Sequence, residues 1–417
     1  MTTTSIENSS RRISNTALAA ILLTTLIASL PAHAQTETVL YNFCSLANCN
    51  DGASPSGGVI ADAAGNLYGN TLDGGAAHGG VVYKLTPSGD ESVLYPFHDG
   101  FPDDGYGPAG LLAMDAQGNL YGTTEQGGRD SLHVVRGDGI VFKVSPQGDE
   151  TILYNFGAFR TDGIQPIGGM VLDAKGNLYG TTYIGGTYTL GTVFRLTPEG
   201  EETVLHNFAE DDTDGGNPWA PLIIDGNGNV FGTTPSGGDS NGGAGTVFEI
   251  TAAGVYKVLH IFTGPPGDGG TPFYGLTLDS QGNLYGATYA GGTSGGRGSD
   301  FGAGTVFKLS PQADGSWTET ILYNFTNQTD SCQNPFSNVV FDAHGNLYGT
   351  TFYGGAFGQG CVYALTPAGK FSNLHTFGRG KDSAEPMGNL LFWQGSLYGT
   401  TIRGGDPGLG TVFKMTP

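Results

Sequence analysis

Seven aspartates recur at equivalent places along the sequence, and their carboxylates are the side chains best placed for chemistry. Each precedes a proline, six of them by four residues and Asp330 by five: Asp51, Asp104, Asp162, Asp214, Asp268, Asp330 and Asp382. A ring of carboxylates could bind a cation or accept hydrogen bonds from sugar hydroxyls. The alternative is a turn in which each carboxylate accepts hydrogen bonds from backbone N–H groups. Because the aspartate recurs in every copy, this structural interpretation is favoured.

A second group of candidate residues lies in loops that differ from copy to copy. Each loop begins with Gly-Gly, and two of the loops carry long insertions. We predict Arg129, His133 and Asp138, from one insertion, as binding residues beside the seven aspartates. Residues that differ between the copies are the better candidates for a binding role, because the residues common to all copies build the scaffold. The alternative is a surface loop without a specific role.

The histidines offer no distinct catalytic base. His206, His260 and His375 occupy a position that is tyrosine in the other copies, so we interpret them as structural. No acid pair and no carboxylate–histidine–tyrosine group stands out from the seven-fold background. We therefore predict no catalytic residue, no metal site and no cofactor.

These residues are carried by a tandem repeat. The phrase Gly-Asn-Leu-Tyr-Gly and its variants begin at Gly65, Gly118, Gly176, Gly228, Gly282, Gly345 and Gly395. In one copy a turn at 162–166 precedes four short runs rich in β-branched and aromatic residues, at 169–172, 177–182, 192–196 and 202–208. Four strands in a period of about 50 residues are typical of the blades of a β-propeller.

The two ends of the repeat region predict how the ring closes. The last copy contains a third strand at 411–414 and no fourth, whereas residues 37–43 resemble a fourth strand without the first three. Pairing the two fragments removes an exposed sheet edge. We therefore predict an all-β protein, with one seven-bladed β-propeller of four-stranded antiparallel blades at 35–417. Strand 37–43 completes the last blade.

The repeat resembles a known family of bacterial proteins. The phrases GNLYGTT (176–182), GTVFKMTP (410–417) and ETVLYNF (37–43) are similar to those of the Gloeobacter/Verrucomicrobium-type tandem-repeat family. The resemblance covers residues 36–417. It implies a propeller fold and export from the cell, and it implies no established activity.

The first 34 residues are typical of a cleaved signal peptide. Arg11 and Arg12 precede an uncharged apolar stretch at 16–30, and Ala32-His33-Ala34 provides the pattern that a signal peptidase needs. We expect cleavage between Ala34 and Gln35. The apolar stretch is shorter than the roughly 20 residues that cross a bilayer, so we expect no membrane span in the mature chain.

The four cysteines lie in the part expected to be exported, where disulfides form. Four cysteines allow three sets of pairs. Cys44 and Cys49 share a short loop after the closing strand, and Cys332 and Cys361 fall on one face of the sixth blade. We therefore predict the disulfides Cys44–Cys49 and Cys332–Cys361.

The formal net charge of −21 excludes nucleic acid as a natural partner and suits neutral or cationic ligands. We predict an exported, monomeric, non-enzymatic binding propeller that recognises a glycan or a cell-envelope component. Two alternatives remain open. One is an extracellular carbohydrate-active enzyme, either a glycoside hydrolase or a polysaccharide lyase, and the other is a structural envelope protein. The expected location is extracellular, at the cell surface or in the periplasm.

Overall fold

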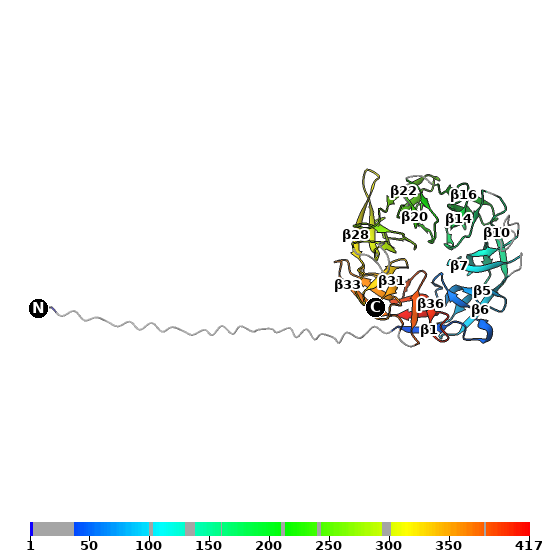
Figure 1. Cartoon of the computed structure of the whole chain (residues 1–417), viewed down its shortest axis with the longest axis horizontal. Coiled ribbons are helices and arrows are strands. Elements are labelled where there is room, and N and C mark those ends of the chain that lie inside the picture. Colours follow the sequence, from blue (N-terminus) through cyan, green and yellow to red (C-terminus); the bar gives the residue numbers. More distant parts are fainter. Residues whose placement is uncertain are drawn as a thin grey trace. The chain divides into compact units, whose positions relative to one another are not determined.

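The computed structural model describes residues 1–2, 37–99, 103–129, 138–159, 161–209, 213–239, 243–293, 302–378 and 381–417. The chain divides into two units, 1–33 and 34–417, and the second contains all the described strands. These strands form short antiparallel sheets arranged as a ring of seven blades (Figure 1). The described residues contain no α-helix, and their one 3₁₀ turn is η1 (Ala47–Cys49). Within them, no helix has the length and apolarity to cross a membrane.

In each blade the strands pair in chain order, except that blade seven takes its fourth strand from the start of the chain. The first blade contains β2 (Ala53–Pro55), β3 (Ile60–Ala61), β4 (Leu67–Asp73), β5 (His78–Leu85) and β6 (Glu91–His98). The second contains β7 (Gly105–Met114), β8 (Leu120–Gly127), β9 (Ile140–Val144) and β10 (Glu150–Asn155). In both blades the first strand pairs with the second, the second with the third, and the third with the fourth.

Blades three to five repeat this order, with the first and the second strand each split into two pieces. Blade three contains β11 (Gly163–Ile164), β12 (Val171–Leu172), β13 (Leu178–Thr182), β14 (Ile184–Gly185), β15 (Thr192–Leu196) and β16 (Glu202–Asn207). Blade four contains β17 (Gly215–Gly216), β18 (Ile223–Ile224), β19 (Val230–Thr234), β20 (Ser236–Gly237), β21 (Thr246–Ile250) and β22 (Tyr256–Ile261). Blade five contains β23 (Gly269–Gly270), β24 (Thr277–Leu278), β25 (Leu284–Thr288), β26 (Ala290–Gly291), β27 (Thr305–Pro311) and β28 (Trp317–Asn324).

The last two blades complete the ring. Blade six contains β29 (Cys332–Pro335), β30 (Val340–Phe341), β31 (Leu347–Gly354), β32 (Cys361–Leu365) and β33 (Phe371–Thr376). Blade seven contains β34 (Ser383–Pro386), β35 (Leu391–Trp393), β36 (Ser396–Gly404), β37 (Thr411–Met415) and β1 (Thr38–Asn42). Strand β1 pairs antiparallel with β37, with Thr38 opposite Lys414 and Asn42 opposite Thr411. The predicted closure is therefore confirmed.

The first strand of each blade begins earlier than the sequence predicted. Residues 162–166 were predicted as a turn, but Gly163–Ile164 form β11 and pair with β14, so this detail was wrong. The paired register skips or ends at the residue before the repeated proline, which has a positive φ of 55–66° in all seven blades: Ser54, Gly107, Gln165, Asn217, Thr271, Asn334 and Glu385. Proline lacks a backbone N–H for the ladder, so the chain is free to bend there.

The bend also connects neighbouring blades. The left-handed conformation costs a residue other than glycine on the order of 1 kcal/mol. Here it directs the backbone N–H toward the preceding blade: that of Gln165 donates to the Asp138 carbonyl at 2.9 Å, and that of Asn217 to the Leu190 carbonyl at 2.8 Å. The residue after the proline then continues toward the middle of the ring.

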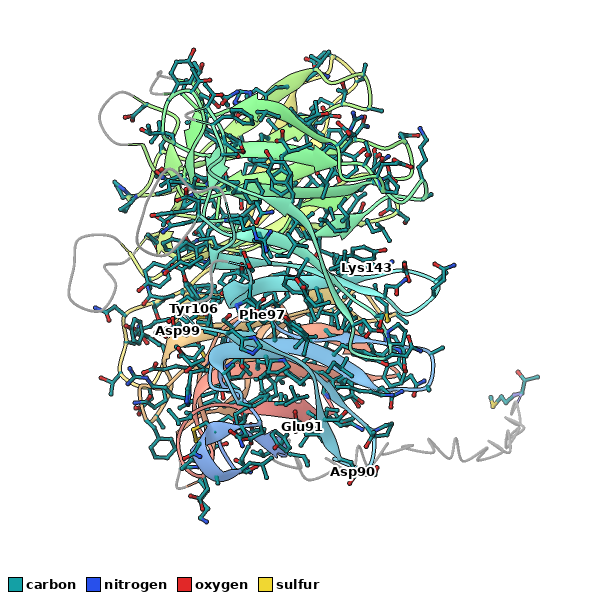
Figure 2. All side chains as sticks on the ribbon, turned by 90° about the vertical axis from the view of Figure 1, so that its right-hand side faces the viewer. Asp90, Glu91, Phe97, Asp99, Tyr106 and Lys143 are labelled. Carbon is teal, nitrogen blue, oxygen red and sulfur yellow. A yellow bond between two sulfur atoms is a disulfide. The ribbon has the colours of Figure 1, made fainter. Side chains whose placement is uncertain are left out.

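The hydrophobic core consists of aromatic rings packed between adjacent blades. Phe97 in β6 meets Phe142 in β9 with ring centroids 4.9 Å apart, and both are fully buried (Figure 2). Equivalent pairs occur at all seven blade boundaries, including Phe43 with Tyr83 where the ring closes. Because each sheet buries both faces only with a neighbour on each side, this packing requires a closed ring.

The two faces of the ring carry different connections. In Figure 2, Asp99, from the link between the first two blades, and Tyr106, at the start of β7, lie on one side, and Asp90, in the turn between β5 and β6, lies on the other. Antiparallel strands place alternate connections at opposite ends of a sheet. The links between blades and the loops between second and third strands therefore share one face, called the loop face below.

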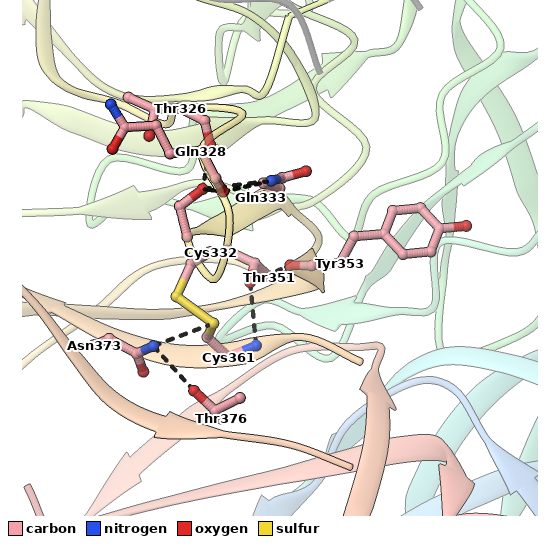
Figure 3. The surroundings of a disulfide bond; sticks show 10 residues. Thr326, Gln328, Cys332, Gln333, Thr351, Tyr353, Cys361, Asn373 and Thr376 are labelled. Carbon is pink, nitrogen blue, oxygen red and sulfur yellow. Dashed lines mark hydrogen bonds between the residues drawn. A yellow bond between two sulfur atoms is a disulfide. The ribbon is translucent and has the colours of Figure 1, made fainter. Parts of the chain in front are cut away.

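Both predicted disulfides are present. Cys44–Cys49 closes a short loop after β1, and Cys332–Cys361 joins the first strand of blade six to its third, with Cα atoms 5.7 Å apart. Figure 3 shows the second bond, where the Cys361 amide donates to the Thr351 hydroxyl at 3.2 Å. The bond therefore bridges across β31, which lies between the two connected strands.

Candidate functional site

The first strands of the blades surround a cavity of about 270 Å³. Its walls are formed by residues near the repeated prolines and by residues at the ends of second strands. Leu72, Glu125 and Tyr183, for example, come from the second strands of the first three blades or directly follow them. The second strands end at the loop face, so these lining residues lie toward that face of the ring.

The residue after each proline occupies the equivalent position in all seven blades, but the type of residue differs from blade to blade. The series is Ser56, Ala109, Ile167, Trp219, Phe273, Phe336 and Met387. Five of these residues line the cavity directly, and Phe273 and Phe336 continue the series through ring contacts with the lining residues Trp219 and Tyr274. Small residues in the first two blades thus face large aromatic ones across the ring.

Six aromatic side chains form a continuous group, called the aromatic arc here. Its members are Tyr183, Trp219, Phe273, Tyr289, Phe336 and Phe352. Consecutive ring centroids are 5.2–6.0 Å apart, from Tyr183–Trp219 at 5.4 Å to Phe336–Phe352 at 5.2 Å, with the planes steeply inclined. Every member is half-buried, so part of each ring remains accessible.

Polar atoms accompany the aromatic surface. Ser56 and Asn389 line the cavity and are only 6% and 7% exposed, yet Ser56 Oγ and Asn389 Oδ1 have no hydrogen-bond partner among the described residues. A buried polar atom without a partner costs free energy that a ligand can recover. Glu125 is the only carboxylate among the lining residues that the structure describes, and Gln165 adds an amide.

The seven predicted aspartates lie away from this cavity. None of them is among its described lining residues. Asp104 shows the common arrangement, since it accepts hydrogen bonds from the backbone N–H groups of His98 at 3.0 Å and Gly105 at 2.7 Å, and from the Tyr95 hydroxyl at 3.2 Å. These bonds match the turn interpretation.

Five other aspartates of the series accept similar bonds from the chain around them: Asp51, Asp162, Asp214, Asp268 and Asp382. Asp330 differs, because it is exposed and has a positive φ of 63°. It is also the member with the longer spacing to its proline. The seven residues thus occupy separate blade boundaries and are not brought together.

Five of these aspartates have a half-buried glutamate nearby, from the start of the fourth strand of the following blade or directly before it. We call these groups the seam carboxyl pairs: Asp51 with Glu91, Asp104 with Glu150, Asp162 with Glu202, Asp268 with Glu319, and Asp382 with Glu37. Burial and the neighbouring negative charge raise the pKa of Glu91, Glu150 and Glu202 to about 7. Glu91 is labelled in Figure 2.

The predicted loop residues are described only in part. Arg129 forms an ion pair with Asp103, and its side chain is 63% exposed. Asp138 is buried, at 5% exposure, where β9 is about to begin. His133 lies outside the described residues, as do the expected cleavage residues Ala34 and Gln35. The structure therefore does not bring Arg129, His133 and Asp138 into one described site.

The aromatic arc is the feature that sequence reasoning missed. Its signal was present in the positions after each proline and after each Thr-Thr of the second strand, where the copies differ most in size and chemistry. Aligning the copies at the prolines shows aromatic residues in blades four to six and small ones in blades one and two. Only the ring reveals that these positions face one another.

A solved structure shows the same fold at low sequence identity. The chain is similar to a structure titled "Streptogramin B lyase structure", with 14% identity, a TM-score of 0.57, and coverage of 91% of this chain and 97% of that chain. A putative gluconolactonase and a gluconolactonase from Xanthomonas campestris are each 16% identical, with TM-scores of 0.41 and 0.44. They cover 76% and 79% of this chain and 89% and 88% of their own chains. No curated protein matches the sequence.

The family comparison covers nearly the whole chain. The Gloeobacter/Verrucomicrobia repeat matches three consecutive stretches, at residues 25–135, 131–299 and 296–417. These stretches include all seven blades, the closing strand and the aromatic arc. The protein therefore belongs to the Gloeobacter/Verrucomicrobia repeat family.

Proposed function

We propose that the protein is an exported binding propeller that holds a neutral carbohydrate chain against the aromatic arc. The observation that carries this proposal is the row of six half-buried rings, of which Tyr183 and Trp219 line the cavity and the other four continue the row by ring contacts. Aromatic faces offer a large apolar area at low entropic cost, and the C–H faces of sugars pack against them. The unpartnered oxygens of Ser56 and Asn389 supply hydrogen-bond acceptors at the same place.

Charge and acid placement support binding of a neutral ligand. The net charge of −21 disfavours anionic partners. Glycoside hydrolysis uses two carboxyl groups about 5–10 Å apart, whereas Glu125 is the single carboxylate among the described lining residues. The lyase and gluconolactonase names belong to proteins that share only the fold, so they do not supply a substrate for this chain.

Export is the second part of the proposal. The pattern of Arg11, Arg12 and Ala32-His33-Ala34 supports cleavage between Ala34 and Gln35. The disulfides Cys44–Cys49 and Cys332–Cys361 support folding in an oxidising compartment. N-terminal sequencing of the protein recovered from outside the cytoplasm tests this part, with Gln35 as the expected first residue.

A glycan array of neutral oligosaccharides tests the proposed ligand class, followed by calorimetry with the best binder. We expect Trp219→Ala to weaken binding about tenfold or more, a loss of about 1.4 kcal/mol, because it removes a central ring of the arc. Tyr188→Ala is the matched control, since Tyr188 is 54% exposed and lies outside the cavity lining. This variant should bind like the wild type.

Two outcomes would contradict the proposal. One is the absence of binding to every neutral sugar on the array, and the other is equal binding by the wild type and Trp219→Ala. Release of new reducing ends, lost in Glu125→Gln, would instead support the enzymatic alternative.

A further inference from the structure

Two blade boundaries contain the same trio of a histidine, an aspartate and a glutamate. One trio is His260 in β22, Asp268 before β23, and Glu319 in β28. Each member comes from a different segment of two adjacent blades, namely a fourth strand, the following link, and the next fourth strand.

The second trio occupies the equivalent place where the ring closes. It consists of His375 in β33, Asp382 before β34, and Glu37 beside β1. In each trio, one nitrogen and two carboxylate oxygens lie within 4.8 Å of one another.

The spacing of the donor atoms fits a small metal ion. His260 Nε2 is 3.8 Å from carboxylate oxygens of both Asp268 and Glu319. His375 Nε2 is 3.6 Å from Glu37 and 3.2 Å from Asp382. A tetrahedral zinc ion holds nitrogen and oxygen donors about 3.3–3.6 Å apart, because its bonds are about 2.0–2.2 Å long. The nitrogen–oxygen distances of both trios therefore lie within a few tenths of an ångström of this geometry.

The imidazole nitrogens face the carboxylates at ion-pair distance. His260 Nε2 and His375 Nε2 are buried and have no hydrogen-bond partner among the described residues. The imidazole side chains are 19% and 18% exposed. A buried ring nitrogen that lacks a partner is costly, and a metal ion is one partner that would satisfy it.

The other blades show how the same position is satisfied without an ion. In three blades the residue is a tyrosine whose hydroxyl donates to the aspartate: Tyr41 to Asp51 at 2.8 Å, Tyr95 to Asp104 at 3.2 Å, and Tyr154 to Asp162 at 3.2 Å. His206 bonds to Asp214 at 2.9 Å, and the glutamate of the trio is replaced by Tyr256, which also donates to Asp214, at 2.6 Å. Among the described residues, only the trios of His260 and His375 bring a histidine nitrogen and two carboxylate oxygens within 4.8 Å of one another.

We propose that the His260–Asp268–Glu319 and His375–Asp382–Glu37 trios each bind one divalent transition-metal ion, best matched by Zn²⁺. One imidazole and two carboxylates suit zinc, whereas calcium and magnesium prefer oxygen ligands alone. The ion neutralises two carboxylates that are otherwise placed together in a boundary with little water. At the second trio it ties the closing strand to blade six, so the ion acts as a cross-link of the ring.

The proposal is tested by measuring the number of metal ions bound per chain. The full mature chain is first treated with a chelator to remove any metal and is then dialysed. The probe is Zn²⁺ alone, titrated in competition with a chromogenic chelator. We expect two ions per chain with a dissociation constant of about 10 µM or lower. His260→Gln and His375→Gln should each remove one ion, and the double variant should remove both.

His206→Gln is the matched control, because His206 occupies the same repeat position but faces Tyr256. It should still bind two ions. Circular dichroism checks that each variant is folded. Titration of the wild type with Co²⁺ gives an independent readout, since a tetrahedral site with one nitrogen donor produces strong visible bands.

Two results would overturn the proposal. The first is no saturable Zn²⁺ binding and no tetrahedral Co²⁺ spectrum in the wild type. The second is two ions retained by the folded double variant, which would place the metal on other residues. Neither result depends on the carbohydrate ligand, because the trios lie outside the cavity lining.

Discussion

A single glycine in the second strand of each blade makes room for an aromatic ring of the third strand. Gly180 in β13 lies against Phe194 in β15, and a Cβ atom added there would lie 2.7 Å from the ring and 3.0 Å from the Met170 sulfur. Real Cβ atoms do not approach so closely. The last glycine of the Gly-Asn-Leu-Tyr-Gly phrase is therefore explained by packing and not by turn geometry.

This packing predicts the effect of one added methyl group. Gly180→Ala should lower the free energy of unfolding by about 1–3 kcal/mol, because the ring of Phe194 is fully buried and has little room to move. Thermal and urea unfolding measure the change. Gly226→Ala is the matched control, since no atom lies within 4 Å of its added Cβ. Equal stability of the two variants would contradict the explanation.

At the scale of elements, each seam carboxyl pair places an aspartate from the link before a blade beside a glutamate at the start of that blade's fourth strand. Glu91 begins β6, Glu150 begins β10, and Glu202 begins β16. One oxygen of each is buried without a hydrogen-bond partner among the described residues. A neutral, protonated glutamate avoids placing a second negative charge beside the aspartate, which is why burial and the aspartate raise its pKa.

The raised pKa values predict that the ring is less stable in base than in mild acid. Between the ordinary glutamate pKa and about 7, the folded chain holds protons that the unfolded chain has released, so stability falls as pH rises through this range. We expect the melting temperature to fall by several degrees from about pH 5 to about pH 9. Calorimetry at several pH values measures the slope.

A triple variant isolates the groups responsible for this slope. Replacing Glu91, Glu150 and Glu202 by glutamine should flatten the dependence on pH, because glutamine does not titrate. The exposed pair Glu199 and Glu201 provides the matched control, and Glu→Gln changes there should leave the slope unchanged. An unchanged slope in the triple variant would show that other groups cause the pH dependence.

For the whole molecule, the closing strand decides whether the ring exists. Strand β1 supplies the fourth strand of blade seven, and Phe43 is fully buried against Tyr83 of the first blade at 4.9 Å. Without this segment, β37 would expose a sheet edge, and two blades would lose their shared aromatic packing. The closure therefore links the ends of the chain through both hydrogen bonds and buried apolar area.

Removing residues 35–43 from the mature chain should abolish cooperative unfolding and cause aggregation. Moving the same residues to the position after Pro417, through a short turn like that at 197–200, should restore the fold, because every other blade connects its third and fourth strands in this way. Circular dichroism melts and gel filtration compare the two chains with the chain that begins at Gln35. A truncated chain as stable as the parent would contradict the role of β1.

The sequence by itself determined the fold, the closure and the disulfides. A blade is a local unit of about 50 residues, and its pattern of strands and turns is repeated often enough to be read directly. The orphan strand at 37–43 and the incomplete last copy then left one way to close the ring. Cys332 and Cys361 fall within one such unit, so their pairing followed from the blade order.

Only the tertiary structure decided which side chains meet at the centre and at the blade boundaries. Tyr183, Trp219 and Phe336 come from three different blades, and they are joined into one aromatic group, through Phe273, because the blades meet around the ring axis. Glu37 and Asp382 stand near opposite ends of the chain and meet only because β1 completes blade seven. A repeat pattern specifies each blade alone, whereas these contacts depend on how the blades are arranged around the ring.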